Sequence, residues 1–203
     1  MKTFTSNEIK EAAAILKQGG LLAFPTETVF GFGAIYDDES AYKRLVQVKR
    51  RPPEQPFTVM CADAKDISKL AIINKKAKLL IEKYMPGQIT LILKAKEGLP
   101  SFAISKEGNV GVRIPNYEIV RELIREVGKP LLVPSANKHG EMPALKVQEV
   151  VDKFSNEIDG IILGDTISNI PSTILLIDDN IHLIREGCIS RNEIESVIGD
   201  KVL

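Results

Sequence analysis

The side chains whose types and spacing could do chemistry in this sequence of 203 residues are mainly cations and hydroxyls. Its two histidines and two cysteines do not stand at the spacing of metal-ligand pairs: they are His139, His182, Cys61 and Cys188. We expect both cysteines to be buried thiols. Because arginine and lysine bind phosphate and carboxylate oxygens, the sequence favours an anion-binding site over a metal centre.

A cluster of basic residues follows the helix that we expect over residues 38–48. Residues 40–53 contain no acid, and their basic side chains are Lys43, Arg44, Lys49, Arg50 and Arg51. Pro52 and Pro53 then hold the backbone of Arg51 extended. The planar fork of arginine matches phosphate oxygens at two points, whereas lysine supplies a point charge. Two interpretations stay open: the cations bind an anion, or they form a solvated helix end that the helix dipole favours.

The segment FPTETVFGFG, residues 24–33, follows a short apolar strand expected over residues 21–24. Thr26, Glu27 and Thr28 offer two hydroxyls and one carboxylate, which suit a small polar ligand or a metal-bound phosphate. The alternative is a plain turn that begins at Pro25. The segment matches a dinucleotide-binding fingerprint only weakly, because the third glycine is missing.

Further polar residues stand at the ends of expected strands. Arg113, in GVRIP, either points to solvent or clamps a carboxylate with its fork. Ser135 and Asn137, in VPSANKHG, form either a ligand-binding loop or a simple turn. A nucleophilic serine is disfavoured, because the turn G-x-S-x-G is absent. The remaining polar residues begin or end late strands: Ser172, Thr173 and Arg185.

The elements that must position these residues alternate between helices and strands. The pattern predicts helices over residues 5–18, 38–48, 74–85, 117–127 and 147–154 and from residue 190, the first one capped by a box of Thr5 and Glu8. It predicts strands over residues 21–24, 57–61, 89–93, 110–114, 131–133, 160–163, 173–177 and 181–184. We therefore expect an α/β fold with a twisted, mixed sheet and flanking helices. Because the polar clusters fall where strands end, we expect them to meet in one large cationic cleft.

Composition narrows the class of protein further. Lysine plus arginine and aspartate plus glutamate each number 27, which argues against a globally basic nucleic-acid binder. The N-terminal residues MKTFTSNEIK contain no apolar signal core, and no apolar run reaches the roughly 20 residues of a membrane helix. No linker or repeat is evident. We expect one domain over residues 1–203, in the cytoplasm and without a membrane partner.

Taken together and in this order, the segments resemble the YrdC family of threonylcarbamoyl-AMP synthases. The matching motifs are P-T-E-T-V-F-G-F-G, K-x-R-P at residues 49–52, P-G-Q-I-T at residues 86–90, V-R-I-P, P-S-A-N, and S-T at residues 172–173 ahead of Arg185. The resemblance implies a reaction in which L-threonine, bicarbonate or CO₂, and ATP give threonylcarbamoyl-AMP and pyrophosphate. The product would serve the modification of an adenosine in tRNAs that read ANN codons, with tRNA and tRNA-modification proteins as downstream partners.

The same resemblance implies roles for individual residues. ATP would be bound by Lys49, Arg51, Gln55, Ser135, Asn137 and Arg185, with Lys49 and Arg51 as the catalytic cations. Threonine would be bound by Thr26, Thr28, Met60, Arg113, Ser172 and Thr173, with Arg113 on its carboxylate. Mg²⁺ would arrive with the ATP phosphates rather than on protein ligands. PTET would form the cavity floor, with Gly31 and Gly33 letting the backbone approach the ligand.

Two alternatives to this function stay open. One is an RNA-binding protein of the same fold, whose affinity would fall steeply with salt. The other is a paralogue similar to YciO that acts on a different acyl-adenylate substrate. Departures from the family pattern keep the second alternative open: Met60 stands where many members carry histidine, and Gln55 stands where many carry asparagine. In addition, Pro171 directly precedes Ser172, and Glu186 follows Arg185.

Overall fold

The computed structural model describes residues 1–52 and 55–203, and Pro53, one of the two prolines expected to stiffen the chain after Arg51, lies outside the described residues. Within this range ten strands form one sheet in the order β1-β8-β2-β3-β7-β4-β6-β5-β9-β10. The strands are β1 (Lys2–Phe4), β2 (Leu22–Pro25), β3 (Phe30–Ile35), β4 (Val59–Met60), β5 (Ile89–Lys94), β6 (Asn109–Arg113), β7 (Leu131–Leu132), β8 (Gly160–Ile162), β9 (Thr173–Ile177) and β10 (Ile181–Arg185). The helices are α1 (Ile9–Lys17), α2 (Glu39–Lys49), α3 (Ala64–Leu70), α4 (Lys75–Tyr84), α5 (Glu118–Val127), α6 (Val147–Phe154) and α7 (Arg191–Ile198), with a 3₁₀ turn η1 (Ser101–Ala103). In the part of the chain so described, no helix has both the length and the apolar content of a membrane span.

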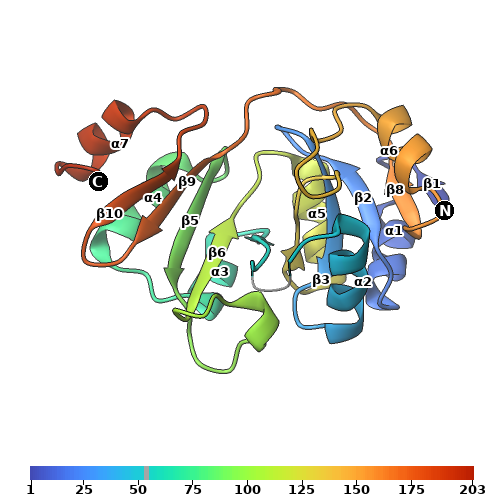
Figure 1. Ribbon diagram of the computed structural model, residues 1–203, viewed down its shortest axis with the longest axis horizontal. Coiled ribbons are helices and arrows are strands. Elements are labelled where there is room, and N and C mark those ends of the chain that lie inside the picture. Colours follow the sequence, from blue (N-terminus) through green and yellow to red (C-terminus); the bar gives the residue numbers. More distant parts are fainter. Residues whose placement is uncertain (53–54) are drawn as a thin grey trace.

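The sheet is mixed, and the prediction of an α/β fold with flanking helices is confirmed. Parallel ladders join β1 to β8, β8 to β2, β4 to β6 and β5 to β9. Antiparallel ladders join the other neighbours. Figure 1 shows the two ends of the sheet as two halves: β1, β8, β2 and β3 lie with α1, α2 and α6, and β6, β5, β9 and β10 lie with α4 and α7.

Residues 21–24 build the core on both faces of the first half. Leu22 and Phe24 pack in an apolar cluster with α1 and α5, whereas Leu21 and Ala23 pack in the cluster that contains α2 and α6. Successive side chains of a strand point to opposite faces, so an unbroken apolar run belongs to a strand covered on both sides. This burial holds β2 in place and puts the PTET segment at its end.

The sequence pattern does not indicate three of the elements: β1, β3 and α3. The sequence does not predict β3, because Gly31 and Gly33 interrupt its run of apolar residues. A Cβ on Gly33 would lie 2.6 Å from the ring of Phe24, and one on Gly31 would lie 2.7 Å from Val133. Because Gly31 and Gly33 have no side chains, β3 can pack closely against its neighbours. At Gly33 the backbone approaches the ring of Phe24, whereas we expected it to approach a ligand.

Two predicted boundaries and one predicted environment are wrong. Helix α1 begins at Ile9, because the backbone N and Oγ1 of Thr5 donate to the Glu8 carboxylate at 2.8 and 2.7 Å and form a turn ahead of the helix. The strand expected over residues 57–61 shortens to β4, whose two residues pair with β7 and β6. Cys61 is buried as predicted, whereas Cys188, in the loop after β10, is exposed.

Candidate functional site

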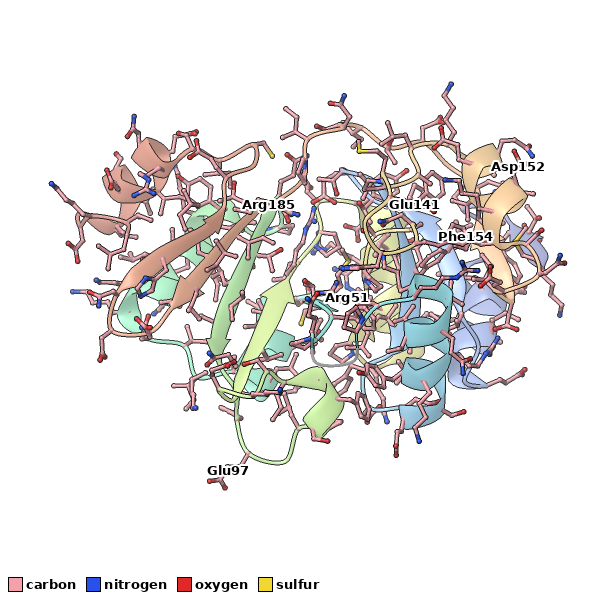
Figure 2. All side chains as sticks on the ribbon, in the orientation of Figure 1. Arg51, Glu97, Glu141, Asp152, Phe154 and Arg185 are labelled. Carbon is pink, nitrogen blue, oxygen red and sulfur yellow. The ribbon has the colours of Figure 1, made fainter. Side chains whose placement is uncertain are left out.

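A cavity of about 660 Å³ opens where the polar strand ends meet. Its volume is typical of a site for a small-molecule ligand. Among the residues that line it are many of those singled out by the sequence: Thr26, Thr28, Arg51, Gln55, Met60, Arg113, Ser135, Ser172 and Arg185. Figure 2 shows Arg51 near the middle of the molecule and Arg185 at the end of β10, so the cavity draws on both halves of the sheet.

Three arginines line this cavity, Arg51, Arg113 and Arg185, and one carboxylate, Glu107, lies among the lining residues. Within residues 1–52 and 55–203, Arg113 has a carboxylate partner, Glu27, whereas neither Arg51 nor Arg185 forms an ion pair. Burial lowers the pKa of Arg51, and burial together with the charge of Arg113 lowers the pKa of Arg185. Arg51 is half-buried and has no ion-pair partner in the described chain, so part of its charge is removed from water without compensation, whereas Arg185 is exposed and donates to the Ser172 carbonyl. An anionic ligand would offset the free-energy cost of this uncompensated charge.

Arg113 does not point to solvent, and its partner is Glu27. Its Nη2 donates to Glu27 Oε1 at 2.7 Å, and its Nε donates to the carbonyl of Gly87 at 3.2 Å. The same Glu27 oxygen accepts from the backbone N of Asn116 at 3.0 Å. Arg113 is 5% exposed and Glu27 3% exposed, so the guanidinium is fixed within the wall of the cavity. In the described chain its Nη1 end has no hydrogen-bond partner and is available to a ligand.

The PTET segment is both a turn and part of the cavity floor. Thr26 Oγ1 donates to the carbonyl of Val29 at 2.7 Å and accepts from the backbone N of Thr28 at 3.2 Å. The two threonine hydroxyl oxygens lie 3.0 Å apart, and both residues line the cavity. The turn therefore uses the hydroxyl of Thr26 and places the hydroxyl of Thr28 beside it.

Lys49 lies behind the wall of the cavity rather than in it. It is 3% exposed, and its Nζ donates to the carbonyl of Ser135 at 2.6 Å and to Asn137 Oδ1 at 2.9 Å. Ser135 Oγ donates to the same Asn137 oxygen at 2.6 Å. Burial, with a smaller effect from the charge of Arg51, lowers the pKa of Lys49 to about 8. Lys49 and Asn137 thus hold Ser135 in place and do not line the cavity themselves.

At the other side of the cavity the structure separates Ser172 from Thr173. Ser172 lines it, and its carbonyl accepts from Nε and Nη2 of Arg185 at 3.1 and 2.8 Å. Thr173 is fully buried, and its Oγ1 donates to the carbonyl of Ile189 at 2.7 Å. Thr173 therefore anchors the loop after β10, which leaves Ser172 as the residue of this pair that can face a ligand.

The basic run at the end of α2 divides into several environments. Lys43 pairs with Glu39, and Arg44 pairs with Asp159, so these two cations form a helix surface. Arg50 is the helix cap, with a left-handed backbone at φ 49° that turns the chain between Lys49 and Arg51. The helix-surface interpretation holds for Lys43 and Arg44, and the anion-binding interpretation stays a prediction for Arg51, which lines the cavity.

Sequence reasoning missed the side chain that contacts Arg51. The Cζ atom of Arg51 lies 5.2 Å from the ring centroid of Phe57, which also lines the cavity. Thr58 and Thr90 are lining residues that the sequence did not single out for a role. The sequence does place Phe57 shortly after the basic residues, which could have suggested a contact with one of them. Only the folded chain shows that its ring lies under the guanidinium of Arg51.

Comparison with known proteins agrees with this architecture. The Sua5/YciO/YrdC family, described as "Telomere recombination", matches residues 14–187. The threonylcarbamoyl-AMP synthase of Bacillus subtilis is 37% identical over 196 residues, which cover 95% of this chain and 57% of that protein. The chain thus spans little more than half the length of this relative.

Two solved structures share the fold. The structure of Pyrococcus abyssi Sua5 complexed with L-threonine has a TM-score of 0.93 and 33% identity, covering 100% of this chain and 62% of that one. The structure of Escherichia coli YciO has a TM-score of 0.85 and 27% identity, covering 92% of this chain and 96% of that one. The family match over most of the sequence, together with these folds, shows that the chain belongs to the Sua5/YciO/YrdC family.

Proposed function

We propose that this chain is a nucleotidyltransferase that makes threonylcarbamoyl-AMP and pyrophosphate from L-threonine, bicarbonate or CO₂, and ATP. The observation that carries the proposal is the single cavity in which three arginines meet the threonine and serine hydroxyls of distant segments. The relative from Bacillus subtilis is named for this activity, and the Pyrococcus abyssi Sua5 structure contains L-threonine. Both facts support the proposal.

On the nucleotide side, Arg51 and Arg185 would contact phosphate oxygens, with Ser135 and Gln55 beside them. Arg51 is the catalytic cation of this proposal, whereas Lys49 acts through Ser135, because its ammonium is bonded to that residue and not directed into the cavity. Mg²⁺ would enter on the phosphates. The oxygen atoms of hydroxyls such as that of Thr28 are the kind of ligand Mg²⁺ accepts.

On the amino-acid side, the free Nη1 end of Arg113 would hold the threonine carboxylate. Thr26, Thr28 and Ser172 would meet its polar groups, and Met60 would pack against its methyl group. The neutral threonine amine forms a bond to the carbon of CO₂, one N–H proton leaves to solvent, and the product is a carbamate. A carbamate oxygen then forms a bond to the α-phosphorus as the bond from that phosphorus to the bridging oxygen breaks, and pyrophosphate leaves with the electron pair.

This transfer needs positioning and charge stabilisation more than proton chemistry. Negative charge grows on the phosphate oxygens in the transition state, and fixed cations in a partly dry cavity stabilise it. The absence of histidine from the lining of the cavity, within the described residues, is compatible with that requirement.

Formation of the same type of anhydride with AMP from a different acyl substrate is the second candidate. It is favoured by Met60, an apolar side chain on the cavity wall, and by the structure of Escherichia coli YciO, which this chain matches over nearly all of that protein. Hand-over to tRNA and tRNA-modification proteins in the cytoplasm is a further proposal that follows from the first candidate, whereas an RNA-binding protein of the same fold is a separate alternative.

The test is to incubate the protein with ATP, Mg²⁺, bicarbonate and labelled threonine, and to look for the mixed anhydride by mass spectrometry. Pyrophosphate release should require threonine. Release that is unchanged without threonine, or that follows another amino acid, would exclude the first candidate and favour the second. Arg51→Ala should lower kcat/KM on the order of 10²-fold, whereas Arg125→Ala, an arginine paired with Asp63 and Glu118 on α5, should not.

A further inference from the structure

Arg51 is held differently from the other two arginines of the cavity. Oxygen acceptors fix Arg113, through Glu27 and Gly87, and a backbone carbonyl fixes Arg185. In the described chain the backbone N of Arg51 donates to the carbonyl of Val46, but no oxygen accepts a hydrogen bond from its guanidinium, and its Nε is buried without a partner. Something other than an acceptor must therefore orient this guanidinium.

The ring of Phe57 is in the right place to do so. Arg51 Cζ lies 5.2 Å from the ring centroid, within the roughly 6 Å at which a cation is attracted to an aromatic face. Phe57 is 2% exposed, and both side chains line the cavity. The contact is thus partly shielded from water, which strengthens the attraction, and it uses none of the N–H donors that an anion would need.

Other aromatic side chains hold the ring itself. Phe57 packs edge-to-face on Tyr42 of α2, with centroids 6.0 Å apart and an interplanar angle of 62°. Tyr42 stacks on Phe102 of η1, with centroids 4.5 Å apart. The backbone turn at Arg50 fixes where the arginine side chain begins. The position of the guanidinium is therefore set at one end by the backbone at Arg50 and on its flat face by the ring of Phe57.

We infer that Phe57 is a positioning residue for nucleotide binding: its ring holds the guanidinium of Arg51 in the cavity with the N–H donors directed at a phosphate. The inference rests on the proposed function, because that function makes Arg51 a phosphate contact. It assigns a role to an aromatic residue outside the K-x-R-P motif, and it predicts that the aromatic ring itself, not only its apolar volume, matters at this position.

The experiment compares matched variants of the whole chain. Phe57→Leu removes the ring and keeps most of the apolar volume, and Phe57→Tyr keeps the ring. Phe102→Leu is the control, since it removes a ring from the same stack without touching Arg51. Each variant is titrated with Mg·ATP by calorimetry, and thermal unfolding checks that it is folded. If Phe57→Leu does not fold, the ring-current shift of Arg51 in the unmodified protein still tests the inference.

We expect Phe57→Leu to weaken the binding of Mg·ATP about fivefold, the size of a partly desolvated cation–π contact. Phe57→Tyr should stay close to the unmodified protein, and Phe102→Leu, whose ring is linked to Phe57 through Tyr42, should have a much smaller effect than Phe57→Leu. In an Arg51→Ala background, Phe57→Leu should produce no further loss, because the ring then has no cation to hold. Equal effects of Phe57→Leu and Phe102→Leu, or independent losses from Phe57→Leu and Arg51→Ala, would overturn the inference.

A spectroscopic readout separates this inference from the proposed function. The Nε–H resonance of Arg51, assigned by its loss in Arg51→Lys, should carry a ring-current shift that disappears in Phe57→Leu and persists in Phe102→Leu. If that shift behaves as expected but Arg51→Ala binds Mg·ATP normally, the ring holds the arginine and the nucleotide assignment is wrong. If no ring-current shift exists, the positioning role is wrong whatever the enzymatic activity.

Discussion

Removal of the Glu27 carboxylate should test how the cavity wall is held together. In the Glu27→Ala variant, the buried Arg113 loses the oxygen that lies 2.7 Å from its Nη2. The two side chains are only 4% and 6% exposed, so the guanidinium would be left largely uncompensated on that side. The backbone N of Asn116 also loses its acceptor. Breaking a buried pair from one side costs about 3–5 kcal/mol.

That loss is a large part of the stability of a typical domain. For a chain of this length it corresponds to a fall in Tm of about 6–20 °C. The assay is urea denaturation followed by circular dichroism, with thermal unfolding as a second measurement. The control is Glu39→Ala, which removes the partner of Lys43 from a pair that is 65% and 68% exposed. This control should cost no more than about 0.5 kcal/mol.

A double variant isolates the charge effect. In Glu27→Ala with Arg113→Met, the uncompensated cation is gone, so the double variant should be more stable than the sum of the two single losses predicts. The reasoning is refuted if Glu27→Ala is as stable as Glu39→Ala, or if the losses at Glu27 and Arg113 simply add. Either result would mean that the pair contributes no coupling to the folded state.

Three further changes follow from the geometry around α2 and Ser135. Burial lowers the pKa of Lys49 to about 8, below the value of about 10.4 in an unfolded chain, so the folded state binds fewer protons between these values; the free energy of unfolding should rise with pH across this window, and urea titrations of Lys49→Gln should lack that rise. Arg50→Gly should stabilise the protein by about 1 kcal/mol, because φ 49° strains every residue except glycine; equal denaturation midpoints would contradict this. Ser135→Ala removes a hydroxyl on the cavity wall that donates to Asn137 at 2.6 Å, and it should weaken Mg·ATP by about 1 kcal/mol in calorimetry without abolishing turnover; complete loss with a trapped acyl-serine would instead indicate a nucleophilic serine.

Local signals account for the parts of the fold that were predicted well. Asp38 and Asn74 cap the N-termini of α2 and α4. Their side chains accept hydrogen bonds from the backbone N of Ala41 and Ala77, as is typical of these residue types at a helix start. The helix over residues 147–154 and the strand over residues 173–177 have the predicted bounds. These elements are encoded by side-chain spacing within a few residues, so the chain need not be folded for them to be recognised.

The amino-acid sequence by itself determined the fold class, the order of the motifs and the expectation that cations gather at strand ends. Only the tertiary structure decided that Arg113 meets Glu27, that Lys49 turns behind Ser135, and that Arg51 lies over Phe57. The physical reason is distance along the chain: the Arg113–Glu27 and Lys49–Ser135 contacts join residues 86 positions apart. Such contacts depend on which strands become neighbours in the sheet, and neither charge pattern nor periodicity records that order.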